Sequence, residues 1–444
     1  MDLSQGSIPK LLLKFSVPAI AGMIINAIYS FIDKVFISQM AGPLAFSGIV
    51  AAMPMLFITI GFSLFIGVGA ATQISIRMGE NRNRIAAKTL GNAFVLFLLI
   101  SGIITVLGLL FLEPLLILYG ARGEVLHYAM IYLRILIGGS VLQTIGFGMT
   151  HLIRAMGKPN EAMIVLIVSA VINIILSFVF VVWLNLGVAG AAISTLIAHS
   201  ITLVLAFYIL LSRKNTTLRL RFRNFKLDWK IVGGILAVGM SPFAKQIMGS
   251  VVLALTNNVL RVHGGDLAFA AMGIITQFGM LFLMPLFGLN QGAQPILGYN
   301  YGAKRYERIR ETLKYTVGFA AVISFIGWCF IFFFPQVPIR IFTDDPELIA
   351  IAITAMPIFG GAFLLAGMQM IMAMFFQSIG KAKIALVLNL LRQVILFIPL
   401  LLILPRIFGL DGVWFAGLWA DIAAFVITSM MFVYTVRTKL RSIA

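Results

Sequence analysis

The stretch "GAATQISIRMGENRNR" (residues 69–84) is followed 223 positions later by a related stretch, "GAQPILGYNYGAKRYE" (292–307). Three small residues coincide in the two copies: Gly69 with Gly292, Ala70 with Ala293, and Gly79 with Gly302. The same offset aligns "AMGKPNEAM" (155–163) with "SIGKAKIAL" (378–386). Such internal similarity indicates that the chain contains two copies of one structural unit.

The composition places both copies in a membrane. Of the 444 residues, 61% are hydrophobic and only 11% are charged, whereas soluble domains carry roughly 25% charged residues. A spanning helix needs about 20 apolar residues. We predict an all-α membrane protein with twelve transmembrane helices in two six-helix bundles. The predicted spans are roughly 11–37, 48–76, 89–112, 125–152, 162–184, 188–211, 231–260, 268–298, 315–334, 348–377, 384–404 and 412–436.

The positions of the basic residues predict the orientation. Twenty-five of the 33 lysines and arginines lie at the helix ends that share a side with the termini. The opposite loops contain four: Arg122, Arg261, Arg340 and Arg406. Because basic residues accumulate on the cytoplasmic side of membrane proteins, we expect both termini in the cytoplasm. This topology explains the net charge of +18, so the charge gives no support to a nucleic-acid partner.

A basic segment divides the chain in the middle. We expect an N-terminal six-helix lobe over 1–211, a cytoplasmic linker over 212–230 and a C-terminal six-helix lobe over 231–444. The favoured interpretation of this segment is a simple stop-transfer linker between the halves, and the alternative is a contact with anionic lipid headgroups, for which it is basic enough. Since six is an even number, both lobes enter the membrane from the same side as parallel repeats. This architecture suits alternating access, and because one chain supplies both walls of a cavity we expect a monomer.

Asp33 lies near the end of a long, mainly apolar run that starts at Leu11, and a carboxylate at the centre of a membrane helix costs about 2.5–3.5 kcal/mol on insertion scales. Asn26 and Ser30 share its helix face, since they precede it by seven and three residues. Lys34 points about 100° away and is a poor ion-pair partner. One interpretation places Asp33 at the membrane interface with its charge in water. The interpretation that we favour places it in an internal cavity, protonated or balanced by Na⁺ or a cationic substrate.

Other polar residues of the first half form two pairs at helical spacing. Asn173 and Ser177 share one helix face, and Thr195 and His199 share another. Such residues either join neighbouring helices by hydrogen bonds or line a transport site. A histidine inside the membrane is a functional candidate. The alternative for His199 is a neutral ring bonded to a backbone carbonyl.

The second half carries a different polar set. Asn257 stands at the position where the first half has its carboxylate. Gln291 and Gln393 lie in other predicted spans and are candidates for a polar cavity wall. Arg392 and Asp421 are candidates for a buried ion pair between neighbouring helices, and such a pair serves either structure or substrate binding.

The sequence contains no motif for catalysis. Cys329 is the only cysteine, which excludes an internal disulfide and a CxxC site, and the four histidines form no HExxH motif. We therefore expect neither an enzyme nor a protein with a resident metal or cofactor.

Several stretches together resemble the multidrug and toxic compound extrusion (MATE) family, nearest its MepA-like bacterial branch. They are "VPAIAGMIINAIYSFIDKVFIS" (17–38), "GAATQISIRMGE" (69–80), "NQGAQPILGYNYGAKRYERIRETL" (290–313), "FFQSIGKAK" (375–383) and "LLRQVILFIPLLLILPRIFGLDGVW" (390–414). The resemblance covers essentially the whole chain. It implies a V-shaped pair of lobes in a bacterial plasma (inner) membrane. It also implies export of amphipathic, often cationic, drugs against entry of H⁺ or Na⁺.

The resemblance also implies a cation site in the N-terminal lobe. The family pattern maps onto Asp33, Asn173, Ser177 and Thr195. Ser177 departs from it, because the family usually has an aspartate there. Because Asp33 is the single carboxylate in the predicted spans of this lobe, the residues favour H⁺ slightly over Na⁺ as the coupling ion. We expect small organic cations and membrane lipids as partners.

The alternative function is a flippase for a lipid-linked precursor on a related fold. Such a protein needs a cavity rich in arginine and lysine to hold a pyrophosphate. The predicted spans supply few such residues: Lys34, Arg134, Lys245 and Arg392. The sequence therefore favours the drug exporter.

Overall fold

The computed structural model describes residues 3, 6–212, 218–342 and 345–439, and every regular element in these ranges is a helix. The first half contains α1 (Ile8–Met40), α2 (Gly42–Gly79), α3 (Asn83–Leu110), α4 (Leu112–Leu118), α5 (Gly123–Gly138), α6 (Ser140–Ala155), α7 (Pro159–Ser177), the π-helical turn η1 (Phe178–Trp183) and α8 (Gly187–Leu211). The short 3₁₀ turn η2 (Phe222–Asn224) follows. The second half contains α9 (Trp229–Gly302), α10 (Tyr306–Phe333), α11 (Gln336–Phe342), α12 (Pro346–Phe359), α13 (Phe363–Ser378), α14 (Ala382–Leu390), the π-helical turn η3 (Leu391–Phe397), α15 (Ile398–Phe408) and α16 (Asp411–Lys439).

The helices of the described ranges account for twelve membrane crossings. Nine helices are long and apolar enough to span, and two bent pairs, α5 with α6 at 59° and α12 with α13 at 47°, each make one further span. The 74 residues of α9 are too many for one crossing, because about 20 residues suffice. Gly265 breaks α9 with φ 66° and ψ −162°, a conformation that glycine adopts without steric cost. Thus α9 crosses twice, and the prediction of twelve spans is confirmed.

The two halves repeat in structure as well as in sequence. The short helix α4 in the first half has its counterpart in α11, and each precedes a bent pair. The span after each bent pair contains a π-helical turn, η1 in the first half and η3 in the second. Both halves run in the same direction through the membrane because six spans separate equivalent helices. The predicted parallel repeat is therefore confirmed.

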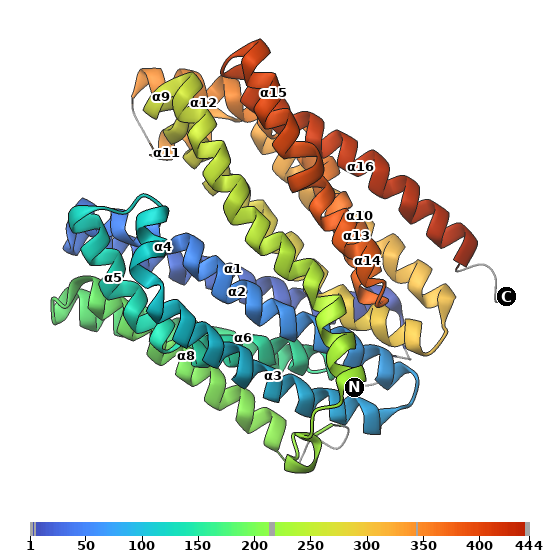
Figure 1. The fold of residues 1–444 in the computed structure, drawn as a ribbon. Helices are drawn as coiled ribbons and strands as arrows, with labels where there is room; N and C mark the ends of the chain where they lie inside the picture. Colours follow the sequence, from blue (N-terminus) through green and yellow to red (C-terminus); the bar gives the residue numbers. More distant parts are fainter. Residues whose placement is uncertain (1–2, 4–5, 213–217, 343–344, 440–444) are drawn as a thin grey trace.

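Figure 1 shows the two halves as two inclined bundles. They converge near the chain's N-terminus, where α9 also begins, and they diverge toward the opposite end, where α4 and α12 lie. The architecture is the V that the family resemblance implied.

The repeated glycines form the seam where the lobes converge. A Cβ atom added to Gly79 would lie 1.9 Å from the carbonyl oxygen of Tyr299, and one added to Gly302 would lie 2.0 Å from that of Ile76. Positions 76 and 299 are themselves equivalent in the repeat, so the two contacts are related by pseudo-two-fold symmetry. Only glycine permits this backbone-to-backbone approach, which small residues provide in membrane helix pairs.

The first helix of each half starts in the core of the other half. Leu12 and Phe15 of α1 are fully buried in a cluster formed mainly by α9, α10, α13 and α14. Val232 and Ile235 of α9 are buried in a cluster formed mainly by α2, α3 and α6. This reciprocal exchange joins the lobes at the converging end.

The segment between the lobes is held against α3. The Oδ1 atom of Asn92 accepts a 2.8 Å hydrogen bond from the backbone N–H of Asp228, and its Nδ2 donates to the carbonyl oxygen of Lys226 at 3.2 Å. The rings of Phe94 and Phe225 pack 5.2 Å apart. Residues 213–217 of the predicted linker lie outside the described residues.

Candidate cation and substrate sites

Asp33 is buried in the C-terminal part of α1, with 9% of its surface exposed. Its neighbour is Asn173 on α7. With the amide nitrogen toward the carboxylate, Asn173 donates to Oδ2 at 3.1 Å and to Oδ1 at 3.2 Å. The other end of the amide then lies 3.4 Å from the hydroxyl of Thr195 on α8. We assign this orientation because the reverse one brings oxygen against oxygen.

Hydroxyl groups complete the surroundings of this carboxylate. The side chains of Ser177 and Thr195 lie close to the carboxylate of Asp33. The Ser177 hydroxyl also lies 2.7 Å from that of Ser194, which donates to the carbonyl oxygen of Ala191 at 2.8 Å. The structure thus brings together the four residues of the predicted cation site, from α1, α7 and α8.

No basic side chain pairs with Asp33 in the described residues. The four ion pairs found there are Arg77–Glu80, Arg82–Glu80, Lys158–Glu161 and Arg392–Asp421. Lys34 is half-buried on a different face of α1. A buried carboxylate without a cationic neighbour either takes up a proton or binds a cation. The geometry is therefore that of an exchangeable cation site.

The other predicted residues of the first half make no hydrogen bond with Asp33 among the described residues. Asn26 and Ser30 are half-buried on the face of α1 that carries Asp33, and no hydrogen bond between either of them and Asp33 is found among the described residues. His199 is half-buried one helical turn beyond Thr195 on α8. Among the described residues no hydrogen bond joins His199 to Asp33. No direct contact therefore supports a role of His199 in cation binding.

The second half contains the predicted pair of Arg392 and Asp421. The Nε and Nη2 atoms of Arg392, in η3, donate to the two carboxylate oxygens of Asp421 on α16, the second at 3.2 Å. Nearby, the ammonium of Lys245 stands 5.7 Å from the centre of the Phe287 ring. Asn257 is half-buried on α9, and the buried Oε1 of Gln393 has no hydrogen-bond partner among the described residues.

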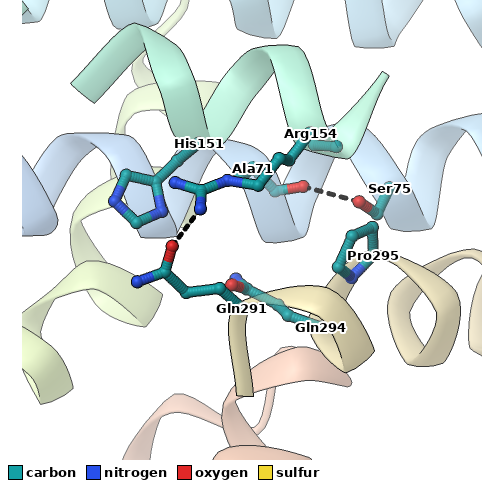
Figure 2. Close-up of a pocket in the computed structure, with 8 residues that line it drawn as sticks. Ala71, Ser75, His151, Arg154, Gln291, Gln294 and Pro295 are labelled. Carbon is teal, nitrogen blue, oxygen red and sulfur yellow. Dashed lines mark hydrogen bonds between the residues drawn. The ribbon is translucent and has the colours of Figure 1, made fainter. Parts of the chain in front are cut away.

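Gln291 belongs to a polar cluster that the sequence did not predict. Figure 2 shows it facing Arg154, whose Nη1 donates to its Oε1. His151 and Gln294 line the same small pocket. Arg154 lies near the end of a predicted span, so from the sequence it belonged to the basic residues expected in the cytoplasm. In the structure it is only 3% exposed. The available signal was the spacing of His151 and Arg154, three residues apart on one helix face.

Comparison with known families decides the kind of protein. The MatE family model matches residues 18–179 and again residues 242–403. The chain belongs to the MatE family. The second match begins 224 residues after the first, in agreement with the repeat seen in the sequence and in the helices.

Relatives of this MatE protein extend over nearly its whole length. It is 29% identical to "Multidrug export protein MepA" of Staphylococcus haemolyticus, over 98% of this chain and 95% of the relative. It is 27% identical to the protein of that name from Staphylococcus aureus, over 97% and 94%. The predicted MepA-like MATE resemblance is confirmed.

Solved structures show the same fold. "MATE multidrug transporter DinF-BH in complex with R6G" is 35% identical, with a TM-score of 0.90 and 98% of each chain covered. A structure described as the outward-facing conformation of a MATE family transporter is 24% identical, with a TM-score of 0.93 over 99% of this chain and 98% of that one.

Proposed function

We propose that this MatE-family protein exports amphipathic, often cationic, organic compounds across a bacterial plasma membrane in exchange for an entering cation. The names of its relatives support the substrate class, since they describe multidrug export and, in one structure, a complex with R6G. The described helices support a multi-pass membrane protein. The distribution of basic residues supports cytoplasmic termini.

Asp33 is proposed as the coupling residue. The observation that carries this role is its burial among neutral hydrogen-bonding groups without a cationic partner in the described residues. A cation on Asp33 would favour one conformation of the lobes, and bound substrate would favour the other. Such a difference in affinity between two states drives exchange transport.

The coupling ion is proposed to be H⁺, with Na⁺ as the alternative. Asn173 directs its N–H groups at both oxygens of Asp33, so its oxygen faces Thr195 instead of a cation held by the carboxylate. Ser177 adds a hydroxyl where a second carboxylate would strengthen Na⁺ binding. A proton needs only the carboxylate, whereas hard cations prefer several oxygen ligands.

The conformation follows from the proposed topology. Gly79 ends α2 and Gly302 ends α9, so each glycine follows two membrane crossings, and the seam lies on the side where α1 and α9 begin. With the termini in the cytoplasm, this seam closes the cytoplasmic side and the structure is outward-facing. The inward-facing state, which is open to the cytoplasm, requires the two lobes to separate at this seam. One chain provides both lobes, so the monomer is the proposed transport unit.

The test is ethidium efflux from proteoliposomes in which a pH gradient and a Na⁺ gradient are imposed separately. Wild-type protein is expected to respond to the pH gradient. Asp33→Asn is expected to lose at least tenfold of that response, whereas the exposed Asp411→Asn should retain it. Efflux by Asp33→Asn at the wild-type rate would remove Asp33 from coupling. A response of wild-type protein to Na⁺ alone would make Na⁺ the coupling ion.

A further inference from the structure

A small polar pocket lies inside the seam between the lobes. Its walls come from α2 and α6 of the first half and from α9 of the second. It has room for about one water-sized particle. The polar residues at its walls are Ser75, His151, Arg154, Gln291 and Gln294. None of these residues belongs to the Asp33 cluster.

The charge at this pocket is positive and uncompensated by protein. Arg154 is 3% exposed, and its guanidinium donates to the neutral acceptors Oε1 of Gln291 and, at 3.2 Å, Oγ1 of Thr150. None of the ion pairs found in the described ranges includes it. Buried charges are normally paired with an opposite charge, because removing an ion from water is costly. The described residues therefore supply no opposite charge for Arg154.

His151 supplies the second observation. It is 4% exposed, and its Nε2 is buried without a hydrogen-bond partner among the described residues. Figure 2 shows its ring beside the guanidinium of Arg154. A neutral imidazole protonated at Nε2 has one N–H to donate, and a buried donor without an acceptor is destabilising. A small acceptor in the pocket would satisfy this donor and the charge together.

We propose that this pocket binds a small monovalent inorganic anion such as chloride, held by Arg154 and His151. The pocket is too small for an organic anion or phosphate, whereas a chloride ion is a single atom somewhat larger than a water molecule. Gln294 is already engaged, since its Nε2 donates to Oγ1 of Thr72 at 2.8 Å. The proposed ligands are therefore the guanidinium and the imidazole N–H.

The anion would also stabilise the closed seam. Arg154 and His151 belong to one lobe, and Gln291 and Gln294 belong to the other. The pocket exists only while the lobes are in contact, so an anion that binds there favours this state by its binding free energy. This consequence rests on the proposed alternating access, whereas the binding itself does not.

The first experiment measures thermal unfolding of the purified full-length protein. Gluconate is replaced stepwise by chloride at constant pH, Na⁺ concentration and ionic strength. We expect a saturable rise in Tm for wild-type protein and for Arg134→Gln, which changes an exposed arginine in the same lobe. Arg154→Gln should weaken the apparent chloride affinity at least tenfold. An equal rise in Arg154→Gln, or no saturable rise in wild-type protein, would overturn the proposal.

Two further measurements do not depend on the folding of Arg154→Gln. His151→Phe keeps a ring beside Phe147, whose centre is 5.4 Å from that of His151, and removes the donor. We expect it to weaken chloride affinity at least threefold. Crystals of wild-type protein grown in bromide should show an anomalous peak between Arg154 and His151. Unchanged affinity in His151→Phe, or a pocket that contains water only, would contradict the proposal. Thermal unfolding and diffraction measure anion binding without transport. These results would therefore stand even if the protein did not export drugs.

Discussion

Gly302→Ala tests whether the glycine seam sets the balance between the two conformations. The added Cβ would stand 2.0 Å from the carbonyl oxygen of Ile76, whereas ordinary contacts begin at 3.4 Å. The obstacle is backbone, so α2 and α9 must separate locally to remove the overlap. Overpacking of this kind costs about 1–3 kcal/mol. The closed seam should therefore lose about five- to 150-fold in population relative to the state in which it is open.

The assay is a distance distribution between spin labels on the outer ends of the lobes. Cys329→Ser removes the native thiol. The labels are attached to Arg122→Cys and His263→Cys, whose native side chains are exposed. In Gly302→Ala the fraction with a short outer distance should increase, because the outer side closes as the seam opens. Gly233→Ala is the matched control, since it lies on the same helix and its added Cβ meets nothing within 4 Å.

A distribution in Gly302→Ala that matches wild-type protein and Gly233→Ala would refute the reasoning. It would mean that the seam absorbs the methyl group without displacing either helix. Ethidium efflux gives a second readout, which should fall in Gly302→Ala while Gly233→Ala keeps the wild-type rate.

Three other substitutions test separate parts of the structure. Asp421→Asn leaves Arg392 without its carboxylate and should lower stability by about 2 kcal/mol, measured by thermal unfolding in detergent; equal stability to wild type would show that water replaces the pair. Ser177→Asp adds a second carboxylate beside Asp33 and should raise efflux driven by a Na⁺ gradient, whereas Ser177→Asn should not; equal responses would contradict the charge argument. Asn92→Ala removes the bonds that hold the linker and should speed tryptic cleavage after Lys226 by about tenfold, and an unchanged rate would show that aromatic packing alone holds it.

The fold was largely predictable because the bilayer restricts it. Apolar segments of about 20 residues indicate spans, and their even number per repeat gives parallel halves. The course of α9 was less visible, since a continuous helix of 74 residues turns back only at Gly265. The segment "RVHGGDL" (261–267) indicated a loop between spans but not how short the break would be.

The polar sites were predicted unevenly. Helical spacing showed that Asn173 and Ser177 share a face, but only the family resemblance placed them beside Asp33. Arg392 and Asp421 were paired from the sequence because they are isolated opposite charges in apolar helices. Arg154 was missed for the opposite reason, since its position near a helix end is typical of an arginine in water.

By itself, the sequence determined the number of spans, the two-fold repeat and the polar residues within the membrane. These properties depend on the distribution of hydrophobic and charged residues along the chain, because this distribution decides which segments insert into the bilayer. Only the tertiary structure decided which polar groups meet. Lipid tails and apolar side chains attract a helix about equally, so close packing at small residues selects its neighbours. The stretch 69–84 shows both levels: its repetition was visible in the sequence, while its contact with 292–307 across the seam required the folded chain.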